Sequence, residues 1–133
     1  MVDRFEELEA WKTARQLVNL IYDLSSRSPF SRDFGFVDQA RRAAVSVMNN
    51  IAEGFESRTQ GLFAEYLGRA KGSAGEVRSV LYVALDRHYV SKEEFDIAYD
   101  LADKSSRQVA RLTAYLERTP TNRTRRVKGA QDA

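Results

Sequence analysis

The chain has 133 residues, a net charge of +2 and no cysteine, which indicates one soluble domain that folds without disulfide bonds. No apolar run approaches the roughly 20 residues of a membrane-spanning helix, and the N-terminal residues are acidic where a secretory signal would be basic and then apolar. These features exclude a membrane partner and favour a cytoplasmic protein.

Four stretches of the chain place apolar residues at steps of three and four, which predicts four amphipathic helices. The first runs over 5–25 and ends before Pro29, because proline disfavours helical geometry in the residue before it. The connection over 26–36 holds three phenylalanines: Phe30, Phe34 and Phe36. We expect these rings to close the end of the core rather than stand in water.

The second helix is predicted over 37–56 and the third over 60–87, with Thr59 as the N-cap of the third. Three glycines share one face of the third helix: Gly68, Gly72 and Gly75. Each interior glycine costs about 0.5–1 kcal/mol of helix stability relative to alanine. The glycines therefore predict either the close approach of another helix or a break near Gly72.

The fourth helix has the best-marked start, because Ser91 stands three residues before Glu94 in the pattern of a capping box. Thr119-Pro120 closes this helix. Four long helices with mostly short links predict an all-α, antiparallel up-down-up-down four-helix bundle over residues 1–118.

Residues 119–133 are expected to form a basic, disordered tail. Its four basic residues stand against one acid: Arg123, Arg125, Arg126 and Lys128 against Asp132. The tail therefore has a net charge of +3 and leaves −1 for residues 1–118. Such a tail suits either weak, salt-sensitive attraction to phosphate or a purely solubilising role.

Residues 39–54, QARRAAVSVMNNIAEG, carry a family resemblance. They resemble the pattern Q-x-R-R-A-A-x-S-I-x-x-N-I-A-E-G of bacterial four-helix-bundle proteins first named for intervening sequences in large-subunit ribosomal RNA genes. Supporting matches lie at residues 8–11, 66–67 and 70–73, and the resemblance covers about residues 5–118. Many relatives have proline near Met48, so its absence here predicts a straighter second helix.

The resemblance implies a bundle that assembles into a ring-shaped homo-oligomer, typically a pentamer. Some relatives are accessory proteins of diversity-generating retroelements, in which a basic pentamer binds nucleic acid and a reverse transcriptase. The resemblance implies no enzymatic activity. The near-neutral body of this chain weakens direct transfer of the nucleic-acid role.

No group of residues is arranged for catalysis, and we assign no catalytic residue, metal ligand or cofactor. The single histidine, His88, lacks the Glu-x-x-His pattern of di-metal bundles, because Leu85 stands three residues before it. One histidine without cysteine removes most zinc sites and nucleophile–histidine pairs. His88 is most simply a residue at the C-terminal end of a helix.

The candidate nucleic-acid-binding residues are arginines and lysines of the second and third helices and the tail. They are Arg41, Arg42, Arg58, Arg69, Lys71, Arg78, Arg123, Arg125, Arg126 and Lys128. Either Arg41 or Arg42 can instead pair with an acid such as Asp38, because the planar guanidinium suits carboxylate and phosphate alike. Interleaved acids such as Glu65 are also typical of an ordinary solvated helix face.

Four residues of the motifs are given structural roles: Asn50, Glu53, Gly54 and Gly72. A partly buried Asn50 can fix helix register or assembly state. Glu53 and Gly54 are expected to help the chain leave the second helix. Four aromatic residues are the candidate oligomer interface, although some of them can belong to the core: Trp11, Tyr22, Tyr82 and Tyr89.

The first functional hypothesis is a non-enzymatic, homo-oligomeric scaffold that binds RNA, DNA or a nucleoprotein partner, with a reverse transcriptase as one such partner. The alternative is a protein–protein interaction module that does not bind nucleic acid. An enzyme or metalloprotein is the third and least supported hypothesis.

Overall fold

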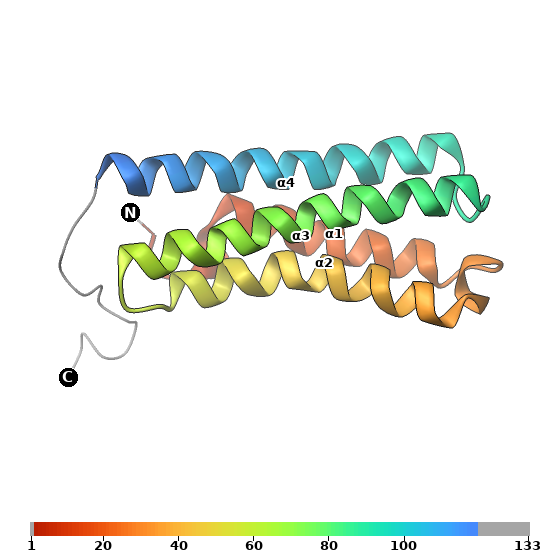
Figure 1. Ribbon diagram of the computed structural model, residues 1–133, viewed down its shortest axis with the longest axis horizontal. Helices are drawn as coiled ribbons and strands as arrows, with labels where there is room; N and C mark the ends of the chain where they lie inside the picture. Colours follow the sequence, from red (N-terminus) through yellow and green to blue (C-terminus); the bar gives the residue numbers. More distant parts are fainter. Residues whose placement is uncertain (1, 120–133) are drawn as a thin grey trace.

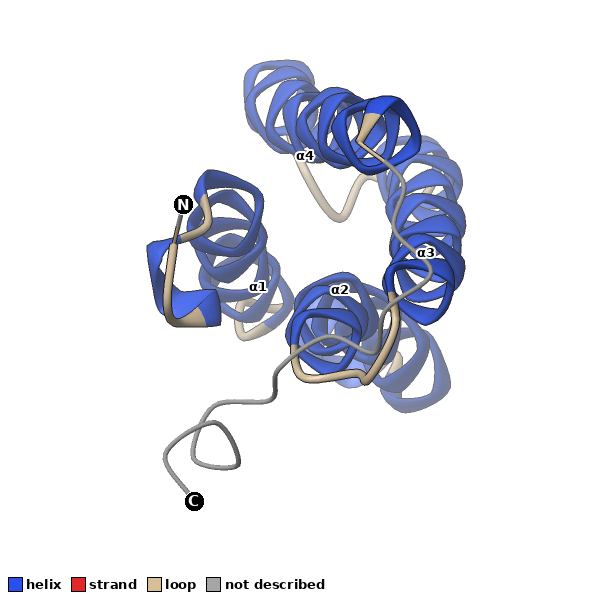
Figure 2. Cartoon of the chain, turned by 90° about the vertical axis from the view of Figure 1, so that its left-hand side faces the viewer, coloured by secondary structure: helices blue, strands red, loops and turns tan. Residues whose placement is uncertain are grey.

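The computed structural model describes residues 2–119, and these form four α-helices. The helices are α1 (Glu9–Ser25), α2 (Phe34–Phe55), α3 (Gln60–Asp86) and α4 (Lys92–Arg118). Consecutive helices run in opposite directions along a common axis (Figure 1). Viewed from the end, they follow one another around that axis in chain order (Figure 2). The predicted all-α antiparallel bundle is therefore confirmed for a single chain.

The first helix begins later than its apolar pattern predicts. Leu8 has an extended backbone (φ −71°, ψ 128°), so α1 starts at Glu9 and a separate 3-10 turn, η1, covers Phe5–Glu7. The turn places Phe5 edge-on against Trp11, with ring centroids 5.2 Å apart. As a result α1 has only 17 residues, against 27 in α3 and in α4.

Aromatic rings close the end of the bundle where α1 passes into α2, after a second 3-10 turn, η2 (Phe30–Arg32). The buried ring of Phe30 stacks on Tyr89 at 5.2 Å and on Phe36 at 5.4 Å. The carboxylate of Asp33 accepts from the backbone N–H of Phe36 at 3.4 Å and caps α2, which begins three residues earlier than predicted. The expectation is wrong for Phe34, whose side chain is 80% exposed.

The other predicted helix starts are confirmed. The hydroxyl of Thr59 accepts from the N–H of Leu62 at 3.0 Å, and Ser91 and Glu94 form the reciprocal capping box. Both α2 and α3 are unbroken, so the break near Gly72 is not found.

The end of α3 explains the position of His88. The N–H of Tyr89 donates to the carbonyl of Ala84 at 2.8 Å, and the N–H of His88 donates to that of Leu85 at 3.0 Å. This pair of bonds is the Schellman motif, and it places His88 in the left-handed region at φ 60°. His88 therefore lies at the helix end, as predicted, and its role there is to terminate α3.

Small residues allow α2 and α3 to pack closely. Six of their buried core residues are alanines: Ala40, Ala43, Ala44, Ala70, Ala74 and Ala84. The exposed glycines of α3 do not serve the predicted close approach of another helix of the same chain, because a Cβ added at Gly68 or Gly72 would meet no atom within 4 Å.

None of the helices in residues 2–119 combines the length and apolar character that a membrane span requires.

Candidate binding surfaces

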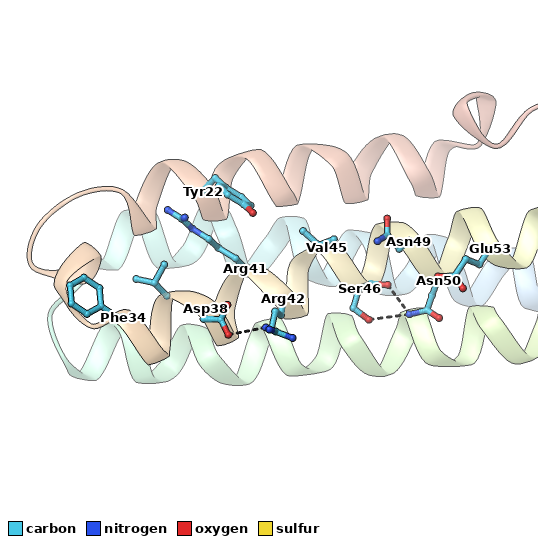
Figure 3. A pocket seen from close by; sticks show the side chains of 11 residues that line it. Tyr22, Phe34, Asp38, Arg41, Arg42, Val45, Ser46, Asn49, Asn50 and Glu53 are labelled. Carbon is cyan, nitrogen blue, oxygen red and sulfur yellow. Dashed lines mark hydrogen bonds and ion pairs between the residues drawn. The ribbon is translucent and has the colours of Figure 1, made fainter.

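A groove of about 880 Å³ runs along the outer face of α2, with Tyr22 of α1 on its border (Figure 3). Polar side chains and four apolar ones line it together; the apolar ones are Tyr22, Phe34, Val37 and Val45. All of residues 39–54, which carry the sequence pattern, lie on this helix. The groove is the first candidate site.

Arg41 is held on the border of the groove by residues of α1. Its Nε donates to the hydroxyl of Ser25 at 2.9 Å, and its Nη2 donates to Ser26 at 3.3 Å. The guanidinium also lies 4.3 Å from the ring centroid of Tyr22, which is a cation–π distance. Arg41 therefore joins α2 to α1, and a phosphate would have to compete with these contacts.

Arg42 pairs with the carboxylate of Asp38 at 2.8 Å, one turn earlier on α2 (Figure 3). This is the acid pairing that the sequence left open. Because Asp38 and Glu53 balance Arg41 and Arg42, the groove has no net charge. A neutral groove with exposed apolar side chains suits a protein surface better than a polyanion.

A chain of side-chain hydrogen bonds crosses from the groove to α3. Asn50 Nδ2 donates to the carbonyl of Ser46 at 2.8 Å and to its hydroxyl at 3.0 Å. The hydroxyls of Ser46 and Ser73 lie 2.8 Å apart, across the contact between α2 and α3. This half-buried network supports the predicted structural role of Asn50, because it fixes the position of one helix relative to the other.

Gly54 has a role that the sequence did not indicate. It is buried inside α2, and a Cβ at this position would lie 2.8 Å from Tyr66 Cβ and 2.9 Å from Phe63 Cδ1. The close approach of α3 therefore requires a glycine here. Glu53, beside it, is exposed on the groove and does not share this role.

The predicted cations of α3 and of the loop before it differ in their availability. Arg58, Arg69 and Lys71 are exposed, and Arg69 pairs with Glu65 at 3.3 Å. Arg78 is half-buried and donates to the hydroxyl of Ser106 at 2.6 Å, which joins α3 to α4. The four candidates of the tail, Arg123, Arg125, Arg126 and Lys128, lie outside the described residues.

The four predicted interface aromatics also separate into two groups. Trp11 is buried against Phe5, and Tyr89 packs against Phe30 while its hydroxyl donates to Asp33 at 2.7 Å. This hydrogen bond raises the pKa of Tyr89 above its ordinary value. Tyr22 and Tyr82 are 42% and 51% exposed, so they are the two whose rings are available to a partner.

The helical part of the chain is similar to known proteins. Residues 6–111 match the model of the family described as 23S rRNA-intervening sequence protein. The chain belongs to this family. A crystal structure of a protein of unknown function from the S23 ribosomal protein family of Bacteroides thetaiotaomicron VPI-5482 is similar in fold, with a TM-score of 0.72. The aligned region covers 79% of this chain and 95% of the crystallised chain, with 15% sequence identity. The search of curated proteins found no match.

In this member of the intervening-sequence protein family, a basic surface is formed by residues outside the family's sequence pattern. It is formed by the loop before α3, the first half of α3 and the second half of α4, which meet at one end of the bundle (Figure 1). Seven exposed cations lie there, and we call them the basic region: Arg58, Arg69, Lys71, Lys104, Arg107, Arg111 and Arg118.

Sequence reasoning missed the four members of the basic region on α4. The available signal was the order of charges along the helix. Over 93–103 there are five acids and no base, whereas over 104–118 there are four bases and one acid. The net charge of the whole chain conceals this separation.

Within residues 2–119, no cluster of three histidine or acidic side chains could hold a metal ion.

Proposed function

We propose that this family member is a non-enzymatic, homo-oligomeric scaffold that binds RNA or DNA through the phosphate backbone. The observation that carries the proposal is the segregation of charge. Residues 58–73 and 104–118 hold seven bases and two acids, and the basic residues of 119–133 follow directly. The two acids are Glu65 and Glu117.

Arginine and lysine side chains on exposed helix faces suit phosphate oxygens, and they read little base sequence. The α2 groove contributes less in this proposal, because Arg41 contacts Ser25 and Tyr22 while Arg42 contacts Asp38. The expected binding is therefore weak in sequence preference and strongly dependent on salt. An oligomer would repeat the basic region and focus its field.

The test compares two triple variants of equal charge by fluorescence anisotropy with a labelled RNA oligonucleotide. The first replaces Lys104, Arg107 and Arg111 with glutamine, and the second replaces Arg4, Lys12 and Arg15 on the α1 side. All six side chains are exposed. If the first three contact phosphate, their loss makes the salt slope of log K shallower by about 2–3, since each contact contributes about 0.7–0.9.

The α1-side variant should retain most of the wild-type slope. Equal losses in both variants would show that only net charge matters, and no binding at low salt would contradict the proposal. Removal of residues 119–133 should weaken binding further if their four bases contribute. Unchanged affinity would exclude the tail from the site.

A specific observation favours a second candidate function, a protein–protein interaction module. The α2 groove is neutral and has Phe34 exposed on its border. In this candidate the partner is a polymerase such as the reverse transcriptase that the family resemblance implies. The association would survive nuclease digestion and would be lost in Phe34→Ser.

A further inference from the structure

Phe34 is the most exposed large apolar side chain among the described residues. It is the first residue of α2 and is 80% exposed. The aromatic cluster beside it is complete without it, because Phe30 already stacks on both Phe36 and Tyr89. Aromatic side chains are enriched at contact surfaces between proteins.

An apolar pocket of about 290 Å³ lies at the same end of the bundle, between α1 and α4. Leu20, Leu24 and Ile97 form its apolar lining, and Ile97 is itself 62% exposed. An ion pair between Arg27 and Glu94, at 2.6 Å, forms part of its border. Cavities of roughly 150 Å³ lined by leucine, isoleucine and phenylalanine accept a benzene ring, so this pocket has room for a phenyl side chain.

Among the mixed charges beside the two features, one pairing is complementary. Arg32, two residues before Phe34, is an exposed cation. Asp23 on the border of the pocket and Glu93 near it are exposed carboxylates. A second copy of the chain therefore offers the pocket both an apolar ring of suitable size and a neighbouring charge of the opposite sign.

We propose that Phe34 of one copy occupies the pocket formed by Leu20, Leu24 and Ile97 of a second copy. The contact is heterologous, because each copy contributes a different surface, and each copy keeps one ring and one pocket for further neighbours. This inference rests on the proposed function, which gives the assembly its role in binding nucleic acid. It identifies the residues through which the oligomer would form.

The position of the two features constrains the arrangement of neighbours. Phe34 lies at the start of α2, and the pocket lies where α1 ends and α4 begins, so both are at one end of the bundle. Copies that pack side by side through this contact must have their axes pointing the same way. All the basic regions then lie toward the opposite end of the assembly, where they would form one extended surface for a polyanion.

The test measures the mass in solution of the full chain and of three variants by sedimentation velocity. The substitutions are Phe34→Glu, Ile97→Glu and the control Leu62→Glu, whose leucine is 41% exposed on α3. Because these side chains are exposed, helix content by circular dichroism should be unchanged in all three. We expect the wild type and the control to assemble, and the first two variants to sediment near the 15.1 kDa of one chain.

Mixing the two monomeric variants gives the decisive result. Phe34→Glu retains an intact pocket and Ile97→Glu retains an intact ring, so their mixture should form dimers of twice the mass of one chain. A reciprocal two-fold contact would limit the wild type to the mass of a dimer, and a different partner for either surface predicts no dimer in the mixture. A monomeric wild type, or variants that assemble like the wild type, would overturn the proposal.

The two proposals can fail separately. If the basic region binds nucleic acid, the monomeric Phe34→Glu variant should still bind RNA at low salt, with a lower affinity because repeated sites are lost. The Lys104, Arg107 and Arg111 triple variant should retain the mass of the wild type. A wild type that assembles but does not bind RNA at low salt would therefore contradict the proposed function alone, and RNA binding by a wild type whose assembly survives Phe34→Glu would contradict the Phe34 contact alone.

Discussion

The contact between α2 and α3 differs sharply from the contact between α1 and α4. In the α2–α3 contact, Gly54 lets α3 approach until Tyr66 and Phe63 fill the space of a side chain, and the Ser46 and Ser73 hydroxyls meet at 2.8 Å. The α1–α4 contact keeps the 290 Å³ pocket described above and a second groove of about 330 Å³, which is bordered by Leu8 and Leu112.

Residue size and helix length explain the difference. The α2–α3 contact is rich in alanine and glycine, whereas α1 offers α4 larger side chains such as Leu20 and Leu24. In addition, α1 is ten residues shorter than α4 and cannot cover its full length. Within residues 2–119, the two buried side-chain atoms without a hydrogen-bond partner, on Ser105 and Gln108, both lie on α4. The closed contact therefore holds the fold, and the open one leaves apolar surface uncovered.

Two isoleucines test this difference most strongly. Ile51 on α2 is 0% exposed and Ile97 on α4 is 62% exposed. We expect Ile51→Ala to lower the free energy of unfolding by about 2–5 kcal/mol, because it leaves a cavity in a packed core. Ile97→Ala should change it by less than about 0.5 kcal/mol. Urea denaturation in a Phe34→Glu background measures both without a contribution from assembly.

Equal losses at the two positions would contradict the comparison. A large effect at Ile97 would mean that the α1–α4 contact is closed in solution, and the pocket would then be unable to accept a ring. A small effect at Ile51 would mean that the core of α2 relaxes around the missing atoms.

Two glycines in helices provide the next test. Gly54→Ala gains helix propensity, but the new Cβ lies 2.8 Å from Tyr66 Cβ and 3.3 Å from the backbone oxygen of Phe63. The expected net loss is about 1–3 kcal/mol. Gly72→Ala, which meets nothing within 4 Å, should stabilise the chain by about 0.5–1 kcal/mol. Thermal unfolding of the two variants should therefore shift in opposite directions, and shifts in the same direction would disprove the close contact at Gly54.

The elements and caps of this bundle follow from local rules and could be predicted from sequence. The Ser91 and Glu94 pair and the Thr59 cap involve only neighbouring residues, and apolar periodicity located all four helices. The family pattern over 39–54 was readable for the same reason. The structural role of the pattern could not be predicted, because Gly54 contacts residues of α3 that the pattern does not include.

The candidate sites depend on distances that no local pattern contains. Three phenylalanines within seven residues look equivalent in the sequence, yet the contacts of Tyr89 select Phe30 and Phe36 and leave Phe34 outside. Similarly, Arg78 and Lys71 look alike as cations of α3, but only Arg78 reaches a hydroxyl of α4. The basic region required knowledge of which half of α4 lies beside the start of α3.

The ion pair across the open α1–α4 contact should contribute least. Glu94 accepts from the backbone N–H of Ser91 at 2.8 Å and pairs with Arg27 at 2.6 Å, and these contacts lower its pKa below the ordinary value of 4.5. A depressed pKa in the folded state means that the carboxylate stabilises the fold fully above 4.5 and loses this effect as the pH falls through the lowered pKa.

Glu94→Gln tests this contribution, because glutamine can keep the bond to the backbone of Ser91 while the ion pair to Arg27 is lost. At pH 7 the variant should be less stable than the wild type by under about 1 kcal/mol, since both partners are partly exposed. The difference in urea midpoint should shrink toward zero in acid below the lowered pKa, because the other carboxylates titrate alike in both proteins. A difference that stays constant or grows in acid would show that the Arg27 contact does not form, and the α1–α4 contact would then lack its one charged link at this end among the described residues.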